Sequence, residues 1–272
     1  MTKGAHSVAG VAVRKGREQA VMRALPDEVP VALVYNGSTQ AVMMATPDDL
    51  HDFALGFSLS EGIITDLTQI EKFEIVKHGQ GLEAQMWLSD DRADALAARR
   101  RFMAGPVGCG LCGIDSLDQA LRDLPAVTSD LTLAADDIPA SMAALRAAQP
   151  LHDQTRAVHA AGFYVAGQGI VAAREDVGRH NALDKVIGAM ARAGVSGAGG
   201  AIAITSRVSV EMVQKCAVAG APVLIAVSAP TSLAVQTALD AGITIAALAR
   251  DDAFEIFTHS ARIKTGAKPH VA

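Results

Sequence analysis

Two cysteines in the glycine-rich segment Gly108–Gly113 have the spacing that most clearly indicates chemistry. The glycines on both sides of Cys109 and after Cys112 admit backbone angles that other residues avoid, so we expect an exposed, movable loop. The basic run Arg99–Arg101 lies upstream, and an amphipathic helical pattern begins at Ile114. Nearby positive charge and a helix N-terminus both favour thiolate over thiol. The sequence therefore predicts nucleophilic sulfur chemistry at these two positions.

A second group of polar residues follows the predicted strands of the C-terminal half. Three apolar runs between 201 and 249 alternate with three helical patterns between 178 and 241, which is typical of a mainly parallel sheet. Ligands bind beyond the C-terminal ends of such strands, where helix N-termini present free N–H groups. The residues there combine arginines, hydroxyls and an amide, a composition suited to phosphates and a polar ring. These candidates are Arg174, Asp176, Arg179, His180, Asn181, Lys185, Ser206, Arg207, Ser228, Thr231, Arg250, Asp251 and Asp252.

Helix capping is the competing interpretation for several of these residues. Serine, threonine and aspartate at helix starts are ordinary N-caps. The grouping of four arginines at one predicted edge favours a ligand site over capping alone. For His180, a supporting role and direct ligand contact both remain open.

The composition favours a large α/β protein. The chain has 272 residues, of which 50% are hydrophobic but only 4% aromatic, so aliphatic side chains must fill the core. Such a length suffices for one large domain or two smaller ones. We expect a flexible arm at 1–28, an N-terminal α+β part at 29–150 that carries the cysteine loop at 108–113, an α/β core with a mixed, mainly parallel sheet at 151–265, and a tail at 266–272.

Charge, hydropathy and cysteine usage exclude several classes of protein. A formal net charge of −5 argues against general nucleic-acid binding. No apolar run of 18 residues or more predicts a membrane span, and the N-terminus lacks the apolar region of a signal peptide. Three cysteines are too few for a disulfide scaffold, so we expect a reducing, cytoplasmic setting.

Several segments together resemble one family, the formate dehydrogenase accessory sulfurtransferases (FdhD). The segment Arg174–Lys185 looks like the family signature, and Gly108–Gly113 matches its cysteine motif. The resemblance extends from about residue 26 to 263. Further similar blocks are Ser209–Lys215, Ser228–Ala234, Phe53–Phe57 and the pair Glu61-Gly62.

The resemblance implies a definite activity. Members take sulfur from a cysteine desulfurase as a persulfide and pass it to a Mo-bis(molybdopterin guanine dinucleotide) cofactor, which is then inserted into formate dehydrogenase. The resemblance also implies a fold similar to that of cytidine deaminases, homodimers, no metal of the protein's own, and Cys109 as persulfide carrier with Cys112 as its partner. The segment that it assigns to the cofactor consists of Leu248, Ala249, Arg250, Asp251, Asp252 and Ala253. Leu248 stands where an aromatic residue is expected, which removes ring stacking there.

Three other functions compete with this one. A Cys-x-x-Cys pair is also the motif of thiol–disulfide oxidoreductases, although three glycines loosen the turn here. Zinc binding would need further ligands, and a deaminase signature would need His-x-Glu before the cysteines. His159-Ala160-Ala161 lacks that glutamate and follows the cysteines. A chaperone that binds the cofactor without using its cysteines is the third alternative.

Overall fold

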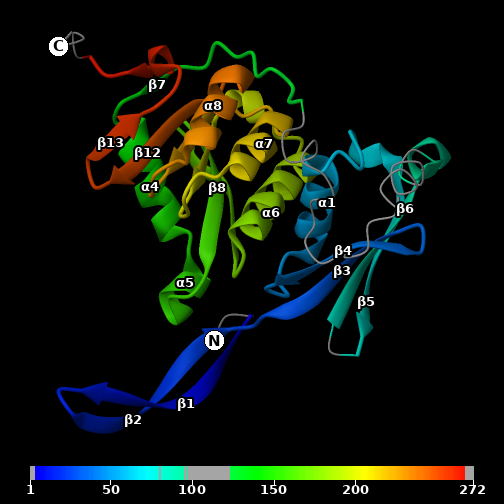
Figure 1. Ribbon diagram of the computed structural model, residues 1–272, viewed down its shortest axis with the longest axis vertical. Helices are drawn as coiled ribbons and strands as arrows, with labels where there is room; N and C mark the ends of the chain where they lie inside the picture. Colours follow the sequence, from blue (N-terminus) through cyan, green and yellow to red (C-terminus); the bar gives the residue numbers. More distant parts are fainter. Residues whose placement is uncertain (1–3, 80, 95, 97–122, 267–272) are drawn as a thin grey trace.

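The computed structural model describes residues 4–79, 81–94, 96 and 123–266. They form an N-terminal arm, an N-terminal unit and a larger C-terminal unit (Figure 1). None of the helices in this described part is long and apolar enough to cross a membrane.

The C-terminal unit is a sheet covered by helices on both faces. Its strands are β8 (His159–Val165), β9 (Gly169–Asp176), β10 (Ala201–Ile204), β11 (Val223–Ala226), β12 (Thr244–Arg250) and β13 (Ala253–Ile256). Its helices are α4 (Asp137–Ala147), α5 (Pro150–Thr155), α6 (Arg179–Arg192), α7 (Val210–Val218) and α8 (Ser232–Ala241). Helices α6, α7 and α8 cover one face and α4 the other (Figure 1). A separate parallel pair joins β7 (Leu133–Ala134) to β14 (Ile263–Lys264).

The strand order among the described residues is β13-β12-β11-β10-β8-β9. Strands β10, β11 and β12 are parallel, whereas the other three pairings are antiparallel. The sheet is therefore mixed, as expected, but antiparallel pairings outnumber the parallel ones, because hairpins close both edges. Since β8 runs against both of its neighbours, β9 points the same way as β10 to β12. The C-terminal ends of these four strands consequently lie at one edge, as predicted.

The N-terminal unit is a four-stranded sheet with a helix on one face. It consists of β3 (Val29–Tyr35), β4 (Ser38–Ala45), α1 (Leu50–Ser60), β5 (Ile70–His78) and β6 (Gly81–Leu88), with the strand order β4-β3-β6-β5. Asn36 and Gly37, a pair typical of two-residue hairpin turns, join β3 to β4 and have φ angles of 48° and 76°. Phe53 of α1 is fully buried against the sheet with Leu33 and Met86.

Two glycines allow α1 and α6 to cross in direct contact. A Cβ atom on Gly56 would lie 1.8 Å from the carbonyl oxygen of Asp184, and one on Gly188 would lie 1.9 Å from that of Asp52. No other residue fits at either position without separating the helices. This crossing joins the N-terminal unit to the C-terminal unit.

The N-terminal arm, expected at 1–28, is a regular hairpin. Its strands β1 (Ala5–Arg14) and β2 (Arg17–Pro26) pair along their whole length. Lys15 and Gly16 form the two-residue turn, with φ angles of 49° and 75°. Positive φ at both turn positions matches the twist of the two strands. The arm extends away from the rest of the molecule (Figure 1).

The boundary between the two units also differs from the one expected at residue 151. Ile138 and Leu145 of α4 are fully buried and pack with Ala201 and Val223 of the sheet. Helix α4 therefore belongs to the C-terminal unit, because it covers an otherwise exposed sheet face. The predicted cysteine loop at 108–113 lies outside the described residues, as does nearly all of the predicted tail.

Candidate functional site

The predicted sulfur chemistry stays a prediction, because Cys109 and Cys112 lie outside the described residues. Cys216, on α7, is fully buried in the main core. Burial raises the pKa of its thiol, so this cysteine is a packing residue. No group of three or more His, Cys, Asp or Glu side chains in the described ranges is arranged to hold a metal ion.

Three helix N-termini meet at the edge where the parallel strands end, and we call this edge the strand-end site. Helix α6 follows β9, α7 follows β10, and α8 follows β11. The loops before α7 and α8 are tied together, since Val208 pairs with Pro230 and the N–H of Thr231 donates to the carbonyl oxygen of Val208 at 2.9 Å. Helix N-termini carry partial positive charge and free N–H groups. The edge is therefore suited to an anionic ligand.

Buried polar atoms at this edge lack partners within the described part of the chain. They are Arg179 Nε and His180 Nε2 in the first turn of α6. Ser209, at the N-cap of α7, is also buried, and against the effect of burial a hydrogen bond from its side chain to Glu211 helps to lower the pKa of that carboxyl. Glu211 lies close to them, with its Oε2 atom 4.0 Å from His180 Nε2. An unpaired buried polar group costs about 1–3 kcal/mol. A ligand that supplied the missing partners would recover this energy.

Both histidines at the strand-end site are held in the neutral form. Burial, followed by the positive charges of Arg179 and Lys215, lowers the pKa of His180 to about 4. Burial, followed by Arg179, also lowers the pKa of His159. His159 begins β8 directly opposite Asp176. At neutral pH the positive charge here therefore comes from arginine, and the imidazoles act as neutral hydrogen-bonding groups.

Sequence reasoning missed three residues at this edge, namely His159, Ser209 and Glu211. Strands β8 and β9 form a hairpin that turns around residues 167–169, and the first strand of such a hairpin starts where the second one ends. That geometry was the available signal for His159. Ser209 and Glu211 follow the predicted strand β10, so the rule used for Arg207 also applies to them.

Three of the predicted ligand-binding residues instead form a buried network. Lys185 Nζ lies 2.7 Å from Asp176 Oδ2, and both side chains are completely buried. Thr46 lies between them, since its Oγ1 atom donates to Asp176 at 2.8 Å and accepts from Lys185 at 2.7 Å. Asn181 donates to Asp176 Oδ1 and to the carbonyl oxygen of Met44. These residues position the start of α6 against β4 and offer no free surface to a ligand.

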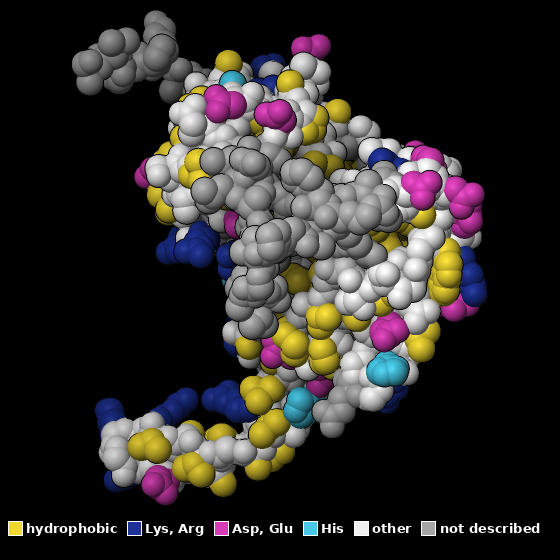
Figure 2. All heavy atoms as spheres, turned by 45° about the vertical axis from the view of Figure 1, so that its right-hand side comes forward, with side chains coloured by type: hydrophobic (Ala, Val, Ile, Leu, Met, Phe, Trp, Pro, Cys, Tyr) yellow, Lys and Arg dark blue, Asp and Glu magenta, His cyan; other side chains and the backbone are white. Residues whose placement is uncertain are grey.

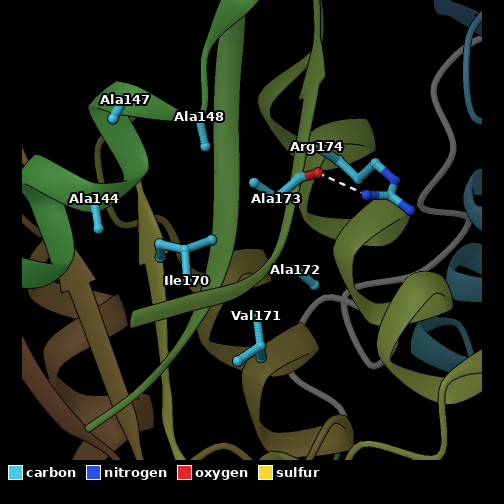
Figure 3. Close-up of a pocket in the computed structure, with 8 residues that line it drawn as sticks. All are labelled: Ala144, Ala147, Ala148, Ile170, Val171, Ala172, Ala173 and Arg174. Atoms are coloured by element: carbon cyan, nitrogen blue, oxygen red, sulfur yellow. Dashed lines mark hydrogen bonds between the residues drawn. The ribbon is translucent and has the colours of Figure 1, made fainter. Parts of the chain in front are cut away.

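Arg174 also bonds within the protein. Its Nη2 atom lies 2.6 Å from Asp52 Oδ2, and its Nε atom lies 3.4 Å from Asp49 Oδ2. Among the predicted site residues, only Arg174 lines the shallow groove between α4 and β9 (Figure 3). This groove has a volume of about 450 Å³ and is otherwise aliphatic, with Ala144, Ala147, Ala148, Ile170, Val171, Ala172 and Ala173 around it. Its lining does not provide the polar groups that the strand-end site has.

The remaining predicted residues lie at the ends of β10, β11 and β12. Thr231 caps α8 by accepting the N–H of Ala234 at 3.2 Å, which confirms the capping interpretation for this residue. Ser206 is buried and donates to the carbonyl oxygen of Arg207. The half-buried or exposed residues Arg207, Ser228, Arg250, Asp251, Asp252 and Ala253 remain available to a ligand.

The segment at 248–253 combines core packing with an exposed turn. Ala249 is buried in the core, and Leu248 is half-buried with a φ of 55°. Asp251 also has a positive φ, of 52°, in the turn between β12 and β13. Ala249 can therefore reach a ligand only through its backbone, whereas the side chains of Arg250 and the two aspartates face solvent.

The fold and the site together define an α/β protein whose strand-end site is suited to an anionic ligand. Comparison with known proteins gives its family. The FdhD/NarQ family model matches residues 26–264. A sulfur carrier protein FdhD from Agrobacterium fabrum is 57% identical over 94% of this chain and 95% of its own length. Its counterpart from Brucella abortus is 55% identical over 90% and 91%. The chain belongs to the FdhD/NarQ family.

A solved structure supports the same assignment. A protein from Desulfotalea psychrophila, assigned as a formate dehydrogenase accessory protein, aligns with a TM-score of 0.77 and 27% identity. The alignment covers 96% of this chain and all of the other. The fold described above is therefore shared with that protein.

Proposed function

We propose that this protein carries sulfur from a cysteine desulfurase to a Mo-bis(molybdopterin guanine dinucleotide) cofactor that is later inserted into formate dehydrogenase. Membership of the FdhD/NarQ family supports the sulfur-carrier role, since relatives more than half identical are named sulfur carriers. The observation in this structure that best supports a cofactor site is the set of unpaired polar atoms at the strand-end site.

The first step is a transfer between cysteines. The Cys109 thiolate attacks the outer sulfur of the desulfurase persulfide. The sulfur–sulfur bond of the donor breaks, a new one forms on Cys109, and the donor cysteine leaves as a thiolate. No electrons are gained or lost overall, so no external oxidant is needed. Cys112, three residues away, is the partner thiol of the carrier.

The second part of the proposal concerns how the cofactor is held. Arg179, Arg207 and Arg250 supply positive charge for the diphosphate of a guanine dinucleotide, together with the helix N-termini. The carboxylates of Asp251 and Asp252 can accept hydrogen bonds from the N–H groups of guanine. The buried residues Asp176, Asn181 and Lys185 support this site by fixing the start of α6.

Guanosine diphosphate tests the site because it contains the guanine and diphosphate portions alone. Isothermal titration should detect its binding to the full chain, and Arg179→Met should weaken it about tenfold or more, through loss of a charge-assisted contact. Arg146→Met is the matched control, since Arg146 pairs with Asp153 on the surface of α4 and α5. Equal affinity of both variants and the unaltered protein would contradict this placement of the ligand.

The proposal also names the partners. The cysteine desulfurase is the sulfur donor, and the catalytic subunit of formate dehydrogenase receives the finished cofactor. The low cysteine content supports a reducing cytoplasm as the place of transfer. The family resemblance supports a homodimer as the working form.

A further inference from the structure

The hairpin arm, residues 5–26, has one strongly apolar face. Residues of β1 and β2 that face each other across the hairpin lie on the same side, and side chains alternate between the two sides along each strand. By this register Val11, Val13 and Met22 share one face. They are 63%, 65% and 64% exposed, the highest values for large hydrophobic side chains in the described part of the chain. Ala5, Ala9, Ala20, Ala24 and Pro26 also lie on this face, together with the polar residues Ser7 and Glu18.

The opposite face of the arm is basic. Arg14, Arg17 and Arg23 lie there by the same register, interspersed with Val8, Val21 and Leu25, and Lys15 is in the turn. Figure 2 shows basic side chains along the upper edge of the arm and hydrophobic side chains spread over it. With four basic residues and the single acid Glu18, the arm has a formal net charge of +3. Because the whole chain carries −5, the rest of it carries −8.

Apart from contacts between β2 and α5, nothing in the described part of the same molecule covers the arm. The hairpin forms a two-stranded sheet of its own, and it projects away from both units (Figures 1 and 2). An isolated two-stranded hairpin is at best marginally stable in water, and exposed apolar patches and open strand edges favour association. The arm therefore has the properties of a contact surface. It precedes the family-matched residues almost entirely, so its apolar face is not part of the matched region.

We propose that the arm forms the contact surface of a homodimer. The apolar face of each arm packs on the body of the second copy, residues 29–266. This inference rests on the homodimer of the proposed function and identifies its contact surface. Charge complementarity favours this partner, since a +3 arm is attracted to a −8 body but repelled by another +3 arm. In a two-fold dimer both arms make the same contact, so the apolar faces of both arms are buried.

Light scattering after size-exclusion chromatography of the full chain tests the proposal. The unaltered protein should be a dimer, and the double variant Val11→Lys and Met22→Lys should raise the dimer dissociation constant at least tenfold. The control is Val8→Lys and Gln19→Lys, which adds the same two charges on the opposite, basic face and should remain dimeric. A monomeric unaltered protein, or a lysine pair on the apolar face that leaves the dimer intact, would overturn the proposal.

Cross-linking keeps the test independent of how well the lysine variants fold. A photoreactive benzoylphenylalanine at position 13, in a mixture of isotopically labelled and unlabelled chains, should give intermolecular links to peptides from residues 29–266. Links confined to one molecule, or between two arms, would refute the packing of each arm on the body of the second copy. Neither experiment uses sulfur or cofactor, so a failure of the sulfur-carrier proposal would leave its outcome unchanged.

Discussion

At the scale of single residues, two buried lysines fix the position of the strand-end site. Lys185 pairs with Asp176, and Lys215 lies 2.9 Å from Asp184 Oδ1 and 3.1 Å from Glu61 Oε1. Burial alone would lower the pKa of Lys215, but the two carboxylates outweigh it and raise the pKa above its ordinary value. Removing one partner of such a buried pair typically costs about 3–5 kcal/mol, so the pairs strongly constrain local geometry. They hold the first turn of α6, where Arg179 and His180 are located.

The neutral state of His180 predicts a dependence of stability on pH. Its pKa is 6.5 in an unfolded chain and about 4 in the folded protein. Between these values the unfolded chain binds a proton that the folded protein does not. The stabilisation from a neutral His180 is therefore complete above pH 6.5 and is lost as the pH falls from 6.5 towards 4.

Urea denaturation at pH 7.5 and pH 4.5 measures this effect. The loss of unfolding free energy between the two pH values should be smaller in His180→Gln than in the unaltered protein, by about 1–3 kcal/mol. His78→Gln is the control, because His78 is exposed at the end of β5 and should show the original loss. The same loss in all three proteins would show that the His180 ring is not held neutral by folding.

At the scale of elements, the α1–α6 crossing depends on glycine. Gly188→Ala should lower the unfolding free energy by about 1–3 kcal/mol, because the added methyl group meets the backbone of Asp52, which cannot rotate away. Gly199→Ala is the control, since a Cβ atom there meets nothing within 4 Å. Urea unfolding of both variants checks the prediction. Equal stability of the two variants would mean that the helices can separate without cost.

The sequence predicted elements well where local patterns decide them. The apolar runs and helical patterns after residue 157 correspond to β10, β11, β12 and helices α6 to α8, because each buried strand is a continuous aliphatic run. The arm was not recognised as a hairpin, since Lys15-Gly16 is a weaker turn signal than Asn36-Gly37 and small residues obscure the alternation. The assignment of α4 to the wrong unit has a different cause, because packing on a distant sheet leaves no local signal.

The candidate site was predictable in place but not in detail. Strand direction alone brings the ends of β9 to β12 to one edge. The sequence therefore placed the four candidate arginines, at positions 174, 179, 207 and 250, at that edge. Which polar residues face a ligand depends on long-range contacts, such as that between Thr46 and Asp176, 130 residues apart. The sequence therefore could not separate the buried Asp176 and Lys185 from the available Arg207 and Arg250. The expected likeness to cytidine deaminases remains a prediction.

At the scale of the whole molecule, three parts have separate tasks in this account. We propose that the C-terminal unit holds a guanine dinucleotide cofactor at the strand-end site, that the cysteine segment carries sulfur, and that the arm joins two copies. The α1–α6 crossing and the two buried lysines join the units, so the strand-end site has a fixed position relative to the N-terminal unit. Sulfur transfer between these parts is the central claim, and it depends on one thiol.

Mass spectrometry of the full chain after incubation with a cysteine desulfurase and cysteine tests that claim most directly. We expect one additional sulfur atom on the peptide that contains Cys109, and none on the peptide that contains the buried Cys216. Cys109→Ser should abolish the gain. Absence of sulfur on Cys109 in the unaltered protein would contradict the account and favour a chaperone that binds the cofactor without carrying sulfur.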